Sequence, residues 1–132
     1  YELNRIKNGA DYVTPEGETI PNTRLTRPAA PARSYAYCSD TIYLEQIIDQ
    51  IKGVNLLFHE ATFSQADQAR AKETFHTTAQ QAGKIASAAQ VKKLIIGHFS
   101  ARYEDESVLL EEASAVFPNT ILAKEMLCVE VM

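Results

Sequence analysis

Short apolar runs alternate with amphipathic segments along most of this chain, and this alternation limits the folds that the sequence can adopt. The runs are too brief for buried helices and are typical of strands; they cover residues 34–38, 54–58, 91–97, 120–123 and 127–131. The other segments carry apolar or small side chains at helical spacing and predict helices at residues 42–52, 66–72, 78–89 and 105–117. Strands separated by helices predict an α/β fold.

The first part of the chain has a different character. Four of the five prolines lie in residues 1–32, and the apolar residues there show little periodicity. We predict a loop-rich connecting segment over residues 1–32, with one short hairpin around Pro15, and a domain over residues 33–132. The chain opens on Tyr1 rather than on Met, and we expect it to be a piece of a longer protein.

Composition narrows the classes of function. A chain of 132 residues with 45% apolar side chains suffices for one core. The net charge of −4 argues against nucleic-acid binding by electrostatics alone, because neutralisation of phosphates normally supplies non-specific affinity. No apolar stretch approaches the roughly 18 residues that a membrane span needs. Cys38 and Cys128 are far apart in sequence, and we expect reduced thiols in a cytoplasmic protein.

Polar side chains suited to metal binding or acid–base chemistry follow three of the predicted strands. They are Asp40 after the first strand, His59 and Glu60 after the second, and His98 after the third. In open α/β sheets, functional groups gather beyond the carboxyl ends of the strands. Carboxylate and imidazole are zinc ligands, so Asp40 and His98 are candidates for an incomplete metal site.

Each candidate also has a simpler interpretation. Asp40 suits the N-cap of the helix predicted at residues 42–52, and His76 suits a cap of the helix at residues 78–89. His98 suits a loop histidine that bonds to the backbone, and Arg102 suits a solvated loop cation. The shared position of these residues at the predicted strand ends favours a functional site.

Four motifs occur in a set order with set spacing. They are residues 37–41 (Tyr-Cys-Ser-Asp-Thr), 59–63 (His-Glu-Ala-Thr-Phe), 76–79 (His-Thr-Thr-Ala) and 98–103 (His-Phe-Ser-Ala-Arg-Tyr). Together they resemble the carboxyl-terminal half of ribonuclease Z, the tRNA 3′-processing endonuclease of the metallo-β-lactamase fold. The resemblance runs from about residue 25 onward, and the His-Glu-Ala-Thr motif is its most specific part.

The resemblance implies a fold and an activity. The fold would be half of a metallo-β-lactamase αββα sandwich, with a mixed sheet and helices on one face. The intact protein would be a cytoplasmic homodimer that removes 3′ trailers from precursor tRNA and binds two zinc ions in each active site.

The resemblance also assigns roles to single residues. Asp40 would bridge the two zinc ions, and His98 would bind one of them. His76, positioned by Glu60, would lie near the scissile phosphate and stabilise charge or protonate the leaving oxygen. A histidine held by a carboxylate keeps a defined tautomer, which suits such a donor.

Substrate contacts are expected from three further residues. Arg102 would contact a phosphate, since a guanidinium binds phosphate oxygens through paired hydrogen bonds. His59 and Thr62, which belong to the same motif as Glu60, are also predicted to contact substrate.

The chain departs from the family pattern in three ways. Ser39 stands where Gly is usual, and Thr77 stands where Ser is usual. The family's His-x-His-x-Asp-His motif lies upstream, and residues 1–36 contain no histidine. We therefore expect that the chain alone neither cleaves RNA nor binds zinc tightly, and that it leaves an apolar sheet face open for self-association or for the missing amino-terminal half.

Two other classes of function remain open. One is a different hydrolase of the same fold, acting on small phosphodiesters or thioesters. The other is a non-catalytic interaction module, for which the three histidines would be scattered in the folded chain.

Overall fold

The computed structural model describes residues 1–132, which divide into two compact units, Tyr1–Ala32 and Arg33–Met132. The first unit contains helix α1 (Glu2–Lys7), a hairpin of strands β1 (Tyr12–Val13) and β2 (Thr19–Ile20), and helix α2 (Asn22–Leu25). The side-chain amide of Asn22 donates to the carbonyls of Ile6 and Ala10, at 2.6 and 2.8 Å. The hairpin around Pro15 is therefore present, whereas the two short helices were not predicted.

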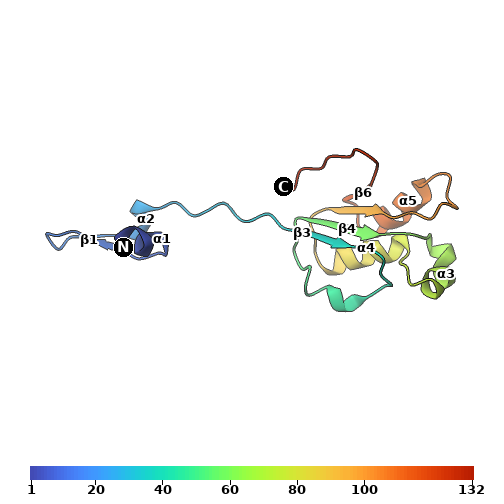
Figure 1. Cartoon of the computed structure of the whole chain (residues 1–132), viewed down its shortest axis with the longest axis horizontal. Helices are drawn as coiled ribbons and strands as arrows, with labels where there is room; N and C mark the ends of the chain where they lie inside the picture. Colours follow the sequence, from blue (N-terminus) through green and yellow to red (C-terminus); the bar gives the residue numbers. More distant parts are fainter. The chain divides into compact units, whose positions relative to one another are not determined.

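The second unit is built on a four-stranded sheet (Figure 1). Its strands are β3 (Tyr35–Cys38), β4 (Leu56–Glu60), β5 (Leu94–Gly97) and β6 (Thr120–Leu122), in that spatial order. All three pairings are parallel, so the prediction of a mixed sheet is wrong for this unit. Residues 127–131 were predicted as a strand, but they form none and add no strand to this sheet. They instead line a hollow over Phe58 and Ile95.

Helices cover one face of the sheet, as predicted. Helix α4 (Ala79–Ala88) and helix α5 (Ser107–Val116) contribute Ile85 and Leu109 to a core that also contains Leu57, Leu94 and Ile96 of the sheet. These five side chains have no solvent exposure. Since alternate residues of a strand point to opposite faces, Phe58 and Ile95 lie on the other face.

The two helices approach each other closely at Gly83. A Cβ atom at that position would lie 2.8 Å from the carbonyl oxygen of Ala113 and 3.1 Å from the Cβ of Val116. The small residues predicted on the Ala-rich helix therefore permit this approach.

The helix predicted at residues 42–52 is wrong. Only a short 3₁₀ turn, η1 (Glu45–Ile47), forms there, and it has no side-chain cap. Several residues of the segment are β-branched, which lowers helix propensity. In addition, the N–H of Thr41 donates to Glu60 and its carbonyl accepts from Thr77, so Asp40 and Thr41 do not start a helix.

The remaining connections place a turn at the carboxyl edge of the sheet. A 3₁₀ turn, η2 (Gln65–Asp67), leads into helix α3 (Gln68–Glu73), and residues 74–78 then lead into α4. Helix α4 begins with a capping box in which Thr78 and Gln81 exchange hydrogen bonds. None of the helices has the length and apolar character needed to cross a membrane.

Candidate active site

The parallel strands bring three chain segments to one edge of the sheet. In the register of the sheet, Cys38 lies beside His59, and Glu60 lies beside Gly97. Asp40 therefore emerges two residues beyond β3, and His98 directly after β5. Both residues have left-handed backbone angles, with φ of 50° and 61°. Such strained angles are enriched at functional sites.

Three of the predicted site residues meet at this edge. Asp40, His76 and His98 each offer one ligand atom, and these atoms lie within 4.8 Å of one another. The Oδ1 atom of Asp40 is 3.3 Å from the Nε2 atom of His98, and the rings of His76 and His98 are 5.3 Å apart between centroids. The predicted metal ligands thus converge, and His76 joins them.

The hydroxyl of Thr62 fixes the tautomer of His98. It donates its one hydrogen to Oε2 of Glu60 at 2.7 Å, so its oxygen accepts from Nδ1–H of His98 at 3.0 Å. In neutral His98, the Nε2 lone pair then faces the carboxylate of Asp40 at 3.3 Å. Two acceptors this close repel each other, and a cation bound by both removes the repulsion. The donor set therefore fits a divalent metal.

Glu60 is the centre of a buried network. Its carboxylate has no solvent exposure and accepts from the N–H groups of Thr41 and Thr77, at 2.8 and 3.0 Å. It also accepts from Nδ1–H of His76 at 2.9 Å. Burial alone would raise the pKa of Glu60, but the hydrogen bonds from Thr62, Thr77, His76 and Thr41 outweigh it and leave the pKa below its ordinary value. Glu60 is thus held as an anion that orients His76.

His59 does not lie where the sequence predicted. Strand β4 extends through Glu60, and His59 points to the helix-covered face, where its exposure is zero. Its Nδ1–H donates to the carbonyl of Glu60 at 2.8 Å, and its Nε2 atom has no partner. Burial lowers the pKa of His59, with the bond to Glu60 opposing the shift. The substrate contact by His59 stays a prediction, and the complete burial of the side chain argues against it.

Thr62 is buried as well. Its exposure is 6%, and its hydroxyl is used by Glu60 and His98. In this structure Thr62 positions other site residues, and its contact with substrate stays a prediction. Thr41 and Thr77, which support Glu60, were not predicted at all, since no sequence signal marks a threonine as a partner of a buried carboxylate.

Arg102 lies beside the site at the surface. Its Nη1 atom is 3.1 Å from Oδ1 of Asp67, and its guanidinium carbon is 5.1 Å from the ring centre of Phe63. Asp67 also accepts a hydrogen bond from Tyr103. That bond, opposed by desolvation and aided by Arg102, lowers the pKa of Asp67. Arg102 is thus aligned on the loop that begins at His98, with nearly half of its side chain exposed.

Similarity to known proteins agrees with this geometry. The chain is 72% identical over 131 residues to ribonuclease Z of Bacteroides thetaiotaomicron and 73% identical over 129 residues to that of Bacteroides fragilis. It corresponds in sequence to the carboxyl-terminal part of ribonuclease Z. The alignments cover 99% and 98% of this chain but 42% of each relative. The chain thus spans about two fifths of the length of the ribonuclease Z relatives that it matches.

Solved structures show the fold. The metallo-β-lactamase fold protein YhfI from Bacillus subtilis superposes with a TM-score of 0.65 at 24% identity, over 70% of this chain and 38% of that chain. Human tRNase Z, short form, superposes with a TM-score of 0.52 at 28% identity, over 64% of this chain and 27% of that chain. No family model matches the chain. The second unit is therefore part of a metallo-β-lactamase fold.

Proposed function

We propose that the protein carrying this chain is a metal-dependent endoribonuclease that removes 3′ trailers from precursor tRNA. The observation that carries the proposal is the convergence of Asp40, His76 and His98 within 4.8 Å, in a sequence that is 72% identical to a ribonuclease Z. The likeness to a human tRNase Z supports the same class of substrate.

The proposed metal is zinc. A carboxylate and an imidazole are ligands that Zn²⁺ accepts, so Asp40 and His98 would help to hold the metal. When bound, the ions would activate water for attack and offset the negative charge of the phosphate. Two ions need more donors than these residues supply, so the remaining ligands would come from the part of the relatives that this chain does not cover. For this reason we expect the chain alone to be inactive.

His76 and Glu60 supply the proton chemistry in this proposal. Because Nδ1–H of His76 donates to Glu60, the Nε2 atom is left for the reacting groups. From that atom, His76 would donate a hydrogen bond to the scissile phosphate or a proton to the leaving oxygen. Glu60 acts through His76 and keeps the ring oriented.

Arg102 would bind a substrate phosphate. Its guanidinium is already held by Asp67 and Phe63, so less conformational entropy is lost when it binds. The positive charge of Arg102 is important for RNA binding, because the chain as a whole carries a net charge of −4.

The sheet face opposite the helices, which residues 127–131 cover only in part, supports assembly with more protein. Tyr35 and Tyr37 on β3 are 53% and 63% exposed, and the ring of Tyr37 stacks on that of Phe58 at 4.7 Å. We propose that this face packs against the rest of the αββα sandwich, and that the complete protein is a homodimer in the cytoplasm. Two free cysteines are compatible with that compartment.

Cleavage of precursor tRNA by the complete protein tests the proposal. We expect cleavage after the discriminator nucleotide that leaves a 3′-hydroxyl, and a much lower rate on a chromogenic phosphodiester. The reverse preference would favour a hydrolase of small phosphodiesters. An absence of both activities would favour a non-catalytic module, although the close approach of His76 and His98 argues against it.

A further inference from the structure

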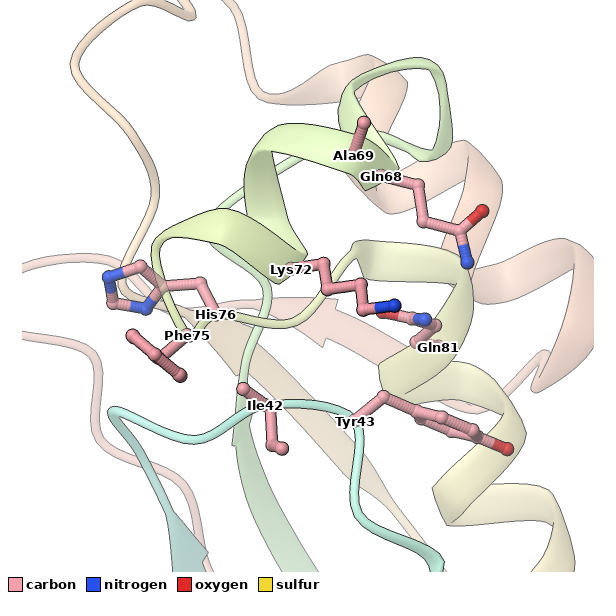
Figure 2. Close-up of a pocket in the computed structure, with 8 residues that line it drawn as sticks. All are labelled: Ile42, Tyr43, Gln68, Ala69, Lys72, Phe75, His76 and Gln81. Carbon is pink, nitrogen blue, oxygen red and sulfur yellow. The ribbon is translucent and has the colours of Figure 1, made fainter.

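An apolar pocket of about 570 Å³ shares His76 with the proposed active site (Figure 2). It lies between helix α3, the start of α4 and the loop that follows β3. Ile42, Tyr43 and Phe75 form much of its apolar wall. Besides His76, the polar groups come from Gln68, Lys72 and Gln81. Pockets of this size, with apolar walls and a few polar groups, are typical of sites for small-molecule ligands.

Phe75 is unusual in both exposure and backbone conformation. Its side chain is 72% exposed and its φ is 60°, in the left-handed region. The N–H of Phe75 bonds to the carbonyl of Lys72, and the N–H of His76 bonds to that of Ala71, at 3.4 and 2.8 Å. This is the Schellman pattern at the end of α3, in which glycine is the usual residue at the left-handed position. A large aromatic ring therefore stands in solvent where glycine would be less strained.

The position of this ring suggests its occupant. Phe75 is the residue before His76, so whatever rests on the ring lies next to the reacting phosphate of the proposed substrate. Aromatic side chains stack on any nucleobase, and such stacking provides affinity where phosphate attraction is weak. The net charge of −4 makes that attraction weak here. The Oε1 atom of Gln81 accepts from the N–H of Thr78, which leaves the amide NH₂ group of Gln81 as a donor for a base carbonyl.

We propose that this pocket holds a nucleobase that flanks the scissile phosphate, stacked on Phe75, with Lys72 near the adjoining phosphate. The inference rests on the proposed endoribonuclease function and names a substrate contact for it. Ile42, which is 40% exposed, would pack against the base from the loop after β3.

The chain contains no tryptophan, so Phe75→Trp provides a single fluorescent reporter at the pocket. Titration of this variant of the 132-residue chain with a short oligouridylate should give saturable quenching. The same ribose–phosphate chain without bases should give little. The matched control is Met126→Trp, at a residue that is 99% exposed and does not line the pocket. Equal quenching of both variants, or equal quenching by the abasic chain, would overturn the proposal. A fluorescence that changes with protein concentration would show self-association and would assign the pocket to a second copy of the chain instead.

Activity of the complete protein gives the second measurement. Phe75→Gly relieves the left-handed strain, so it should not lower the melting temperature, yet it should lower kcat/KM for precursor tRNA about 10-fold. The loss should shrink on a precursor that is abasic at the contacted nucleotide, whereas Phe75→Trp should retain activity. Full activity of Phe75→Gly, or equal losses on both substrates, would contradict the pocket assignment. Lack of cleavage by the unsubstituted complete protein would instead contradict the proposed function, and the fluorescence titration would still decide whether the pocket binds bases.

Discussion

The Oε1 atom of Glu60 lies 2.9 Å from the Nδ1 atom of His76, and it joins a fully buried carboxylate to an imidazole whose side chain is 22% exposed. The buried partner is itself fixed by the backbone of Thr41 and Thr77. One edge of His76 is therefore anchored in the protein interior, while the ring remains accessible at the site. This relationship couples the stability of the fold to the orientation of the proposed proton donor.

Replacement of Glu60 by Gln tests that coupling. The amide keeps the size of the carboxylate but puts an NH₂ group against donors that need an acceptor. We expect the free energy of unfolding to fall by about 2–4 kcal/mol, because buried donors lose their partners. Urea denaturation of the chain measures this change. Glu111→Gln, on the exposed side of α5, is the control and should change stability by less than about 0.5 kcal/mol. Equal effects of the two substitutions would refute the role of Glu60.

Replacement of Thr62 by Val tests the link between Glu60 and His98. Valine is similar in shape but cannot accept from Nδ1–H of His98, so the ring loses the bond that turns Nε2 toward Asp40. We expect zinc affinity or cleavage by the complete protein to fall about 10- to 100-fold, as for other residues that orient metal ligands. Thr62→Ser keeps the hydroxyl and should retain most of the function. An equal loss in both variants would mean that packing, not the hydroxyl, matters at this position.

Asp67 should make the stability of the chain depend on acidity. The hydrogen bond from Tyr103 is the largest cause of the lowered pKa of Asp67. Desolvation opposes this lowering, and Arg102 adds to it. A carboxyl with a lower pKa in the folded state contributes stability that is fully present above its unfolded value of 3.8 and is lost as the pH falls through the folded value. The stability difference between the wild type and Asp67→Asn should therefore be largest above about pH 4 and shrink below it. Urea denaturation at several pH values measures it, and a difference that grows in acid would contradict this assignment.

Arg102 should contribute one phosphate contact. In the complete protein, Arg102→Ala should weaken binding of precursor tRNAs uniformly and lower the slope of log affinity against log salt by about 1. Arg33→Ala provides the control, because Arg33 pairs with Glu130 near the start of β3, at the opposite end of that strand from Asp40. An unchanged salt slope for Arg102→Ala would remove Arg102 from the RNA-binding surface.

Much of the sheet and the meeting of Asp40 with His98 could be predicted from the strand ends, whereas the place of His76 followed only from the resemblance to ribonuclease Z. Short apolar runs located the ends of β3 and β5, and parallel strands place those ends together. His59 was misplaced because β4 runs two residues beyond its predicted end at Phe58, which makes His59 a strand residue on the helix-covered face rather than a loop residue. The end of β4 beyond Phe58 depends on pairing with Gly97, which local sequence does not encode.

Other features depend on tertiary contacts. The segment around Ile47 has apolar residues at helical spacing, yet it forms no α-helix. The backbone just before it is held by bonds of Thr41 to Glu60 and Thr77, which are distant in sequence. The role of Thr62 likewise arises only when three strand ends are assembled. The pocket beside Phe75 depends on the left-handed turn after α3, which the sequence does not signal because glycine is absent there.

Complementation tests the central claim most directly. The chain is mixed with zinc and with the separately produced portion of the complete protein that it lacks, and cleavage of precursor tRNA is followed. We predict no cleavage by either piece alone, cleavage at the 3′ trailer by the mixture, and no rescue when the chain carries Asp40→Ala or His98→Ala. Cleavage by the mixture that persists with both substitutions would show that Asp40 and His98 do not complete the metal site.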